Sequence, residues 1–448
     1  MDFQSFKQSV IARCQVLGVT QYELYYQSSR STTVGVFRHE INQFTGSDDG
    51  GVCLRCIVDG RMGYASTQEL SEDQAIALVD TAIDNAAVLE TDDPVFLGKG
   101  GQCYESLNRP QPPVPSTEEL IQSALSAQQA LYDADPAVVD GTTTQAISEG
   151  ECIAICNSEG LDLHYENQIS GLITVAVISN GQEMANHVEL RLDALSAIDV
   201  EDLAQTTVFR ALKKLGGDMP STGTCPVVFS PKAMSDLLQV FSGMFSAERA
   251  RKGLSRLAGQ EGCAIAAPCV TIVDNPFHPD SPMPMPFDAE GSPTRCKAVV
   301  EQGVLKTLLY DLKNAALSGV DTTGNAAKAG YNAPVGIRPF SMSIVSGNHS
   351  PEDLLMMAGE GLYVDSLSGL HAGANAVSGD FSVESAGYLI RQGQLADRVK
   401  TCTVAGNFYD LLKDISALAD DSHLPMPLGA TAFGAPTTLV RALSVAGK

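Results

Sequence analysis

The residues best suited to metal chemistry in this chain are its seven histidines and eleven cysteines. Zinc peptidases place two histidines one turn apart on a helix, with a glutamate beside the first that activates the metal-bound water. His39-Glu40 begins such a motif, but Gln43 and Phe44 stand where the second histidine would be needed. The other histidines are scattered along the chain. The sequence therefore predicts no catalytic metal site of this kind and assigns no catalytic or metal-ligating residue.

The cysteines are also poorly spaced for a shared metal. Cys53 and Cys56 lie three residues apart in a predicted strand, where they point to opposite faces and cannot chelate together. Cys152 and Cys156 share a face of another predicted strand, and we expect both to fill the core. An odd number of cysteines with irregular spacing favours reduced thiols over a disulfide framework.

Other catalytic motifs are absent, because the chain contains no Gly-x-Ser-x-Gly, phosphate-binding loop or dinucleotide fingerprint. Asp288 and Glu290 are paired carboxylates that would share a face of a strand, as substrate or partner contacts or as a turn-stabilising pair. Arg249 and Arg251 belong to a basic cluster, which is either a solvated loop or a contact for a partner or substrate carboxylate. Further candidate peptide or partner contacts are Asn325 and Asp380.

The first half of the chain predicts helices alternating with antiparallel strands. A helix is expected over residues 3–17, followed by short strands at 22–26, 32–37, 40–44 and 51–58. Ser71 and Ser116 begin two further helices, each with Gln or Glu three residues later. The Gly- and Pro-rich stretch 94–115 connects these two helices. A second strand group at 142–188 and a helix at 199–215 complete this half.

The second half is richer in glycine turns and short strands. Met219–Gly223 marks the predicted boundary, which gives an N-terminal α+β domain at 1–218 and a β-rich domain at 224–448. Ser230-Pro231 and Ser350-Pro351 each predict a helix start, with proline at the first helical position. A last helix is expected from about Asn407. The predicted fold class is α+β.

The composition excludes several functions. A formal net charge of −24, with 29 basic and 53 acidic residues, argues against direct nucleic-acid binding. No apolar run reaches the length of about 18 residues that spans a bilayer. The N-terminus lacks the basic and apolar regions of a signal peptide. We therefore expect a cytoplasmic protein without membrane or nucleic-acid partners.

An ordered series of motifs resembles the TldD/PmbA family, whose active members are zinc-dependent peptidases. The series consists of Pro226–Gln239, Pro286–Gly291, Thr322–Asn325, Ser378–Ser382 and Val404–Asn407. In the TldD branch, the helix after the first of these strands carries H-E-x-x-x-H, and a cysteine near the C-terminus completes the site. Here that helix is expected over residues 230–246 and has no His, Glu or Cys, and no cysteine follows Cys402. The chain therefore resembles the PmbA (TldE) branch.

The resemblance implies a subunit without zinc or another cofactor, paired with a TldD-like zinc peptidase, with itself as a homodimer, or with both. Such complexes process or degrade small unfolded peptides, and the family also carries the label of modulator of DNA gyrase. In this interpretation the partner supplies the zinc and its water, and this chain supplies interface and part of a peptide-holding cleft. Two alternatives remain, a self-sufficient hydrolase with an unrecognised site and a homodimeric peptide-binding pseudoenzyme.

Overall fold

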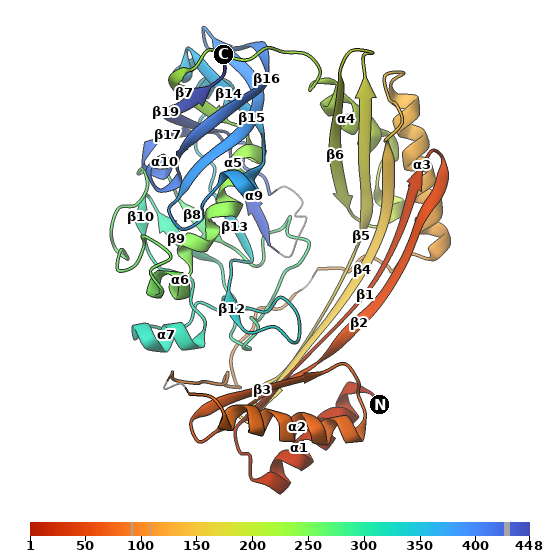
Figure 1. Ribbon diagram of the computed structural model, residues 1–448, viewed down its shortest axis with the longest axis vertical. Helices are drawn as coiled ribbons and strands as arrows, with labels where there is room; N and C mark the ends of the chain where they lie inside the picture. Colours follow the sequence, from red (N-terminus) through yellow and green to blue (C-terminus); the bar gives the residue numbers. More distant parts are fainter. Residues whose placement is uncertain (91–92, 108, 425–430) are drawn as a thin grey trace. The chain divides into compact units, whose positions relative to one another are not determined.

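The computed structural model describes residues 1–90, 93–107, 109–424 and 431–448, and the chain divides into two compact units (Figure 1). The first unit contains residues 1–214 together with two segments from the second half of the sequence, 285–294 and 311–336. The second unit contains residues 215–284, 295–310 and 337–448. Both units mix helices with largely antiparallel sheets, which confirms the predicted α+β class.

A six-stranded sheet in the order β3-β2-β1-β4-β5-β6 is the frame of the first unit. All of its neighbouring strands are antiparallel, as the sequence predicts. The strands are β1 (Tyr22–Phe37), β2 (Glu40–Val58), β3 (Arg61–Thr67), β4 (Thr143–Asn157), β5 (Asp162–Ser179) and β6 (Met184–Leu192).

The strands of this sheet are longer than predicted. The sequence suggested separate strands at 22–26 and 32–37, and a turn at Ser47–Gly50, but β1 and β2 run through both regions without interruption. The polar residues Ser28–Thr33 pair with β2 on one side and with β4 on the other, so the ladder continues despite their turn-forming composition. Gly50 allows β1 and β2 to approach closely in this region, because a Cβ atom there would lie 2.7 Å from the Gln27 carbonyl oxygen.

Two helix pairs cover the ends of one face of this sheet (Figure 1). Helices α1 (Phe3–Leu17) and α2 (Glu72–Ala87) pack on a cluster that includes Leu24, Leu54 and Cys156. Helices α3 (Thr117–Ala134) and α4 (Val200–Leu212), with the short 3-10 helix η1 (Leu195–Ala197), pack on a second cluster that includes Ala146. Cys156 and Ala146 are an even number of residues apart on β4, so both clusters lie on the same face. The middle of this face lies between the helix pairs.

The helix starts agree with the sequence. The Ser71 side chain accepts a hydrogen bond from the Gln74 amide, and Ser116 forms a complete capping box with Glu119. Each cap satisfies an amide that has no partner within its own helix. None of the helices in the described part of the chain combines the length and apolarity needed to cross a membrane.

The opposite face of the sheet, near the α1 and α2 end, is covered by the two late segments of the first unit. They contain α7 (Leu312–Ser318), β11 (Ala326–Ala327) and the start of β12 (Gly336–Ile337). Phe287 contacts Tyr165 of β5 edge-on at 6.4 Å between ring centroids. The Tyr104 hydroxyl donates a hydrogen bond to the Gly291 carbonyl at 2.8 Å.

The second unit contains two larger sheets. One has the order β16-β15-β14-β7-β19-β17, and the other has the order β10-β9-β8-β13-β18. The first comprises β7 (Gly223–Phe229), β14 (Gly361–Ser368), β15 (Asp380–Arg391), β16 (Gln394–Asn407), β17 (Ile415–Leu418) and β19 (Thr438–Ala446). The second comprises β8 (Ile272–Asp274), β9 (Lys297–Glu301), β10 (Val304–Leu305), β13 (Ser341–Ile344) and β18 (Ala432–Gly434).

Short helices connect these strands. They are α5 (Pro231–Phe241), the 3-10 helix η2 (Ser242–Phe245), α6 (Ala247–Arg251), α8 (Pro351–Ala358), α9 (Leu370–Gly373) and α10 (Phe408–Asp414). The helix starts predicted at Ser230-Pro231 and Ser350-Pro351 are confirmed. The predicted last helix is shorter than expected, because Ile415 and Leu418 are buried on strand β17, paired with β19, instead of on a helix.

Candidate functional site

Helix α5 is the element on which the family resemblance would place a catalytic metal. Strand β7 leads into it, and the Ser230 side chain caps its first turn by accepting a hydrogen bond from the Ala233 amide at 3.1 Å. Pro231 occupies the first helical position, where its missing N–H has no intrahelical acceptor. The apolar face of the helix is fully buried and comprises Met234, Leu237, Leu238 and Phe241.

The polar groups of α5 do not fit a catalytic zinc ion. Ser235 is 2% exposed, and its hydroxyl donates a hydrogen bond to the Pro231 carbonyl at 2.7 Å, so this hydroxyl is engaged with the helix backbone. Asp236 forms an ion pair with Lys232 one turn earlier. A catalytic zinc ion needs three nitrogen, sulfur or carboxylate ligands, and α5 has no His, Glu or Cys. One salt-bridged carboxylate does not meet this need.

A polar surface cluster is anchored by aromatic packing to the C-terminal end of α5. The Phe241 ring stacks on Phe408 at 4.7 Å between centroids and touches Phe381 at 6.3 Å. These two rings directly follow Asn407 and Asp380 in the chain. The Asn407 side-chain amide donates to the Asp380 carboxylate at 2.7 Å and to the Ser378 carbonyl at 2.9 Å. The aromatic stack therefore fixes the two motifs that carry Asp380 and Asn407 beside each other.

A cation completes this cluster. The Arg256 guanidinium lies over the Tyr409 ring, 5.0 Å from its centroid, and the Arg256 amide donates to the Tyr409 hydroxyl at 3.2 Å. The hydrogen bonds from Asn407 and Ser378, together with the positive charge of Arg256, hold the pKa of the exposed Asp380 below its usual value. We call Asp380, Asn407 and Arg256 the Asp380 cluster.

The basic residues predicted as contacts lie on α6, a few residues before Arg256. Arg251 is exposed, whereas Arg249 is half-buried. The Arg249 guanidinium lies against Gly243, where a Cβ atom would come within 2.0 Å of it. Gly379, with φ of +83°, makes similar room, because a Cβ atom there would strike the Tyr409 ring. The sequence pointed to Asp380 and to the basic cluster, but gave no signal for Tyr409, which links them.

The remaining predicted contacts, Asp288, Glu290 and Asn325, lie together in the interior of the first unit. Their exposed fractions are 2%, 4% and 0%, respectively. Asp288 and Glu290 lie in a turn and not on a strand, so the expectation of a shared strand face is wrong. The Asp288 carboxylate accepts hydrogen bonds from the amides of Glu290 and Ser292, both at 2.9 Å. This placement favours the turn-stabilising interpretation over a substrate contact.

Glu290 joins a buried ion cluster formed with Glu23 and Arg55, which we call the Arg55 network. The Arg55 Nε atom donates to Glu23 Oε1 at 2.9 Å, and its Nη1 atom donates to Glu290 Oε1 at 3.2 Å. Glu290 Oε2 also accepts from the Leu312 amide at 2.8 Å. The network thus joins β1 and β2 to both late segments of the first unit. The sequence signal for this network was the presence of a charged residue, Glu23 or Arg55, among the apolar residues of each of two predicted strands.

The electrostatics of this interior are strongly perturbed. Burial and the neighbouring Glu290 raise the pKa of Asp288 to about 8, against the opposing effect of its backbone hydrogen bonds. Burial also raises the pKa of Glu290, although Arg55 opposes it. Burial would lower the pKa of Arg55, but Glu23 and Glu290 outweigh it and hold that pKa well above its usual value. The Lys328 ammonium lies 4.6 Å from the Tyr25 ring centroid, and burial lowers its pKa.

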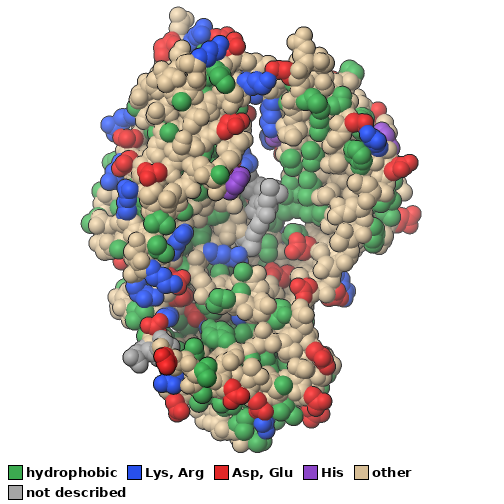
Figure 2. All heavy atoms as spheres, in the orientation of Figure 1, with side chains coloured by type: hydrophobic (Ala, Val, Ile, Leu, Met, Phe, Trp, Pro, Cys, Tyr) green, Lys and Arg blue, Asp and Glu red, His purple; other side chains and the backbone are tan. Residues whose placement is uncertain are grey.

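The surface charge is dispersed. On the face drawn in Figure 2, acidic side chains are spread among basic and neutral ones over the described residues. The excess of acidic over basic residues therefore forms no single acidic field on this face, and it agrees with a role in solubility.

Sequence comparison matches three parts of the chain to one family. Residues 222–447 match the PmbA/TldA metallopeptidase C-terminal domain, residues 22–86 match domain 1, and residues 110–215 match the central domain. The chain is 24% identical over 402 residues to the metalloprotease PmbA of Escherichia coli O157:H7, covering 88% of this chain and 86% of that protein. It is 27% identical over 414 residues to a metalloprotease of Methanothermobacter thermautotrophicus, covering 89% of this chain and 87% of that protein.

Solved structures share the fold over nearly the whole chain. A protein of Thermotoga maritima described as a modulator of a DNA gyrase superposes with a TM-score of 0.89 at 29% identity, covering 99% of this chain and 100% of that one. TldE from Thermococcus kodakarensis superposes with a TM-score of 0.86 at 24% identity, again covering 99% and 100%.

Proposed function

The chain belongs to the PmbA/TldD metallopeptidase family, and we propose that it is the subunit of a two-subunit peptidase that does not hold the catalytic zinc. The observation that carries the proposal is the composition of α5, where Ser235 and Asp236 are tied to the helix itself and no His, Glu or Cys is present. In this proposal a TldD-like subunit provides the zinc and its water. This chain contributes an interface and part of the cleft that holds a small unfolded peptide in the cytoplasm.

The Asp380 cluster is the surface that we assign to that contact. It presents one carboxylate and one guanidinium close together, and the exposed Arg251 lies a few residues before Arg256. Such a pairing can bind the charged termini or side chains of a peptide, or the matching charges of a partner. The Phe241 stack anchors the cluster to α5, so its position depends on the same helix.

The proposal predicts that peptide hydrolysis requires both subunits. The purified chain supplied with zinc is expected to leave an unfolded peptide intact, and a mixture with a TldD-like subunit is expected to hydrolyse it. Replacing the zinc-site glutamate of that partner by glutamine should abolish turnover, because the base that activates water is lost. The measurement is peptide cleavage by mass spectrometry, with co-elution in size-exclusion chromatography as the check of assembly.

Variants of α5 provide the matched control. Ser235→Ala and Asp236→Asn in this chain should leave turnover by the assembled mixture largely unchanged. A large loss of rate with assembly intact would show that this chain supplies chemistry. Hydrolysis by the chain alone that survives a chelator would instead favour a self-sufficient hydrolase, and tight peptide binding without turnover in any mixture would favour a binding protein.

Asp380→Asn tests the contact surface. The amide oxygen can still accept the Asn407 hydrogen bond, so the change removes charge with little change of shape. We expect a few-fold rise in the KM of the mixture, or in the dissociation constant of the complex, with kcat unchanged. Asp397→Asn, another exposed carboxylate of the second unit, paired with Arg391, is the control. If both constants stay at their wild-type values, or kcat falls, the assignment of this surface is wrong.

A further inference from the structure

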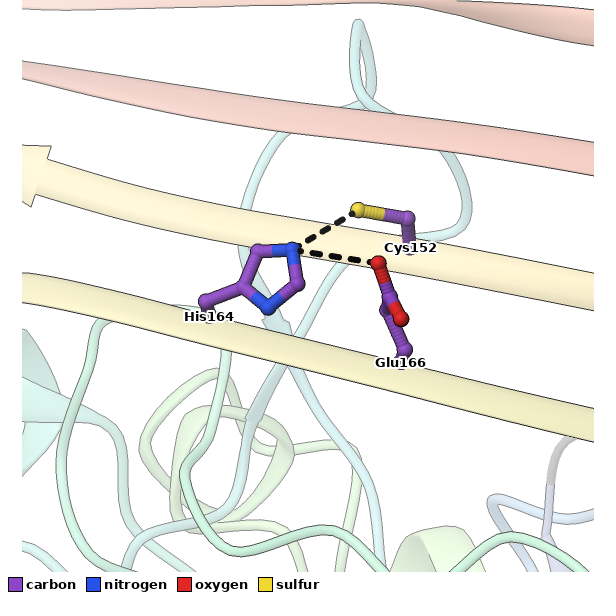
Figure 3. Close-up of side chains that lie close together, drawn as sticks. All are labelled: Cys152, His164 and Glu166. Carbon is purple, nitrogen blue, oxygen red and sulfur yellow. Dashed lines mark hydrogen bonds and ion pairs between the residues drawn. The ribbon is translucent and has the colours of Figure 1, made fainter. Parts of the chain in front are cut away.

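A cysteine, a histidine and a glutamate converge on the first unit's sheet (Figure 3). Cys152 lies on β4, and His164 and Glu166 lie on β5. Among the described residues, they form the one group of three such side chains whose potential ligand atoms all lie within 4.8 Å of one another. Cys152 was expected to fill the core, but it is half-buried and contacts His164.

The strand register explains why the three side chains meet. Cys152 pairs directly with Glu166 across the antiparallel ladder, and His164 pairs with Ala154 two residues further along. Residues two apart on a strand share a face, so all three side chains project to the same side. This is the side that carries both helix pairs, because Cys152 lies between Ala146 and Cys156 on β4 at even spacing. The site thus lies in the middle of that face.

Two of the three distances between the potential ligand atoms match those of a metal site, and the third is no more than 4.8 Å. His164 Nε2 lies 3.4 Å from Cys152 Sγ and 3.5 Å from Glu166 Oε1. Zinc bonds of about 2.3 Å to sulfur and about 2.0 Å to nitrogen or oxygen, arranged as a tetrahedron, put such atoms about 3.3–3.6 Å apart. Little movement is needed to place a metal ion between them. Both partner strands are held by a continuous ladder without a bulge, so the arrangement is built into the sheet.

The surroundings suit an open site that exchanges its metal. The His164 and Glu166 side chains are 61% and 70% exposed, so solvent reaches the position that a fourth ligand would take. Ser28 on neighbouring strand β1 pairs directly with Cys152 in the ladder, which places a hydroxyl-bearing side chain next to the thiol, where an outer contact can orient a ligating sulfur. Thiolate, imidazole and carboxylate together select zinc and similar borderline ions over magnesium or calcium.

We propose that Cys152, His164 and Glu166 bind a divalent cation of the zinc class, with water as the fourth ligand. Binding forms a bond from the metal to Cys152 Sγ and releases the thiol proton to solvent. His164 binds through Nε2 as neutral imidazole, and Glu166 binds through one carboxylate oxygen. The site is independent of α5 and of the two-subunit proposal, so either one can fail without the other.

Cobalt(II) reports directly on this site, because it replaces zinc and gives a charge-transfer absorption in the near ultraviolet when a thiolate binds. Titrating the metal-depleted full chain with Co²⁺ should give one equivalent of that band, together with the visible bands of tetrahedral cobalt, and Zn²⁺ should displace both. Cys152→Ser should remove the charge-transfer band. His164→Ala should weaken binding by more than about tenfold, since loss of even an outer-shell partner commonly costs 10- to 100-fold.

Cys103→Ser is the matched control, because Cys103 is an exposed thiol of the first unit that does not belong to the group. This variant should keep the full cobalt spectrum. Circular dichroism of each variant should match the wild type, so that a lost band reports a lost ligand. The proposal is overturned if cobalt binds without a thiolate band, if the band survives Cys152→Ser, or if micromolar protein binds no cobalt.

Discussion

Arg55→Met is expected to destabilise the first unit by about 3–5 kcal/mol, the usual cost of removing one partner from a buried ion pair. The variant leaves Glu23 and Glu290 facing each other with side-chain exposures of 1% and 6% and without their shared cation. Their lost hydrogen bonds cannot be replaced by water in that interior. Hydrogen exchange of β1 and β2 amides, followed by mass spectrometry in increasing denaturant, measures the loss for this unit alone.

Two comparisons distinguish the effect of leaving buried carboxylates without their cation from the effect of simply removing a positive charge. Arg30→Met removes an arginine from the same sheet, where it pairs with Asp48 at the surface, and it should have little effect. Adding Glu23→Gln and Glu290→Gln to Arg55→Met should restore part of the stability, because no uncompensated charge remains. If Arg55→Met behaves like Arg30→Met, the network does not hold the late segments in place.

Stability of the first unit is expected to fall as the pH rises toward about 8. The pKa of Asp288 is about 8 in the folded protein, against its usual 3.8, so the folded state binds a proton that the unfolded chain has released. Such a group stabilises fully below its unfolded pKa, and the contribution is lost as the pH rises through the folded pKa. The window of change therefore lies between about pH 4 and pH 8. Hydrogen exchange of β4 and β5 amides, corrected for intrinsic exchange rates, follows it.

Asp288→Asn isolates this titration from that of the many surface carboxylates. The amide oxygen can still accept from the Glu290 and Ser292 amides, but the Ala326 amide loses its acceptor, Asp288 Oδ2, so the variant is less stable at acidic pH. Its stability should nevertheless fall less steeply with pH than that of the wild type. Parallel profiles for the two proteins would show that Asp288 is already ionised at pH 5.

The local signals in the sequence predicted much of the fold. Caps such as Ser116 with Glu119, and proline at the start of α5, are decided within one helical turn, and the structure confirms them. Strand length was harder to predict, because Ser28–Thr33 and Ser47–Gly50 have turn composition. Strand pairing, visible only in three dimensions, overrides that preference: Ser28–Thr33 pairs with β2 and β4, and Ser47–Gly50 pairs with β1.

The candidate sites divide in the same way, into features visible in the local sequence and features that depend on the three-dimensional structure. The absence of metal ligands on α5 can be read from one helix, and Asp380 belongs to a recognisable motif. By contrast, the Cys152–His164–Glu166 group depends on the register of β4 and β5, and the Arg55 network joins residues 235 positions apart. Neither group has a regular spacing in the sequence from which its members could be predicted to meet. The charged residues Glu23 and Arg55 within predicted strands were the one hint that a buried partner was needed.

The discontinuous first unit has a consequence for biosynthesis. A ribosome adds about 5–20 residues per second, so Glu290 follows Arg55 by about 10 to 50 s. During that interval β1 and β2 have emerged, but the segments that cover their second face have not. The nascent chain must keep this apolar and charged surface in solution until residue 336 has left the exit tunnel. The need for chaperones should therefore be greatest while one face of this sheet is still uncovered. A ribosome that stalls in the first 284 residues would release a fragment that lacks both late segments.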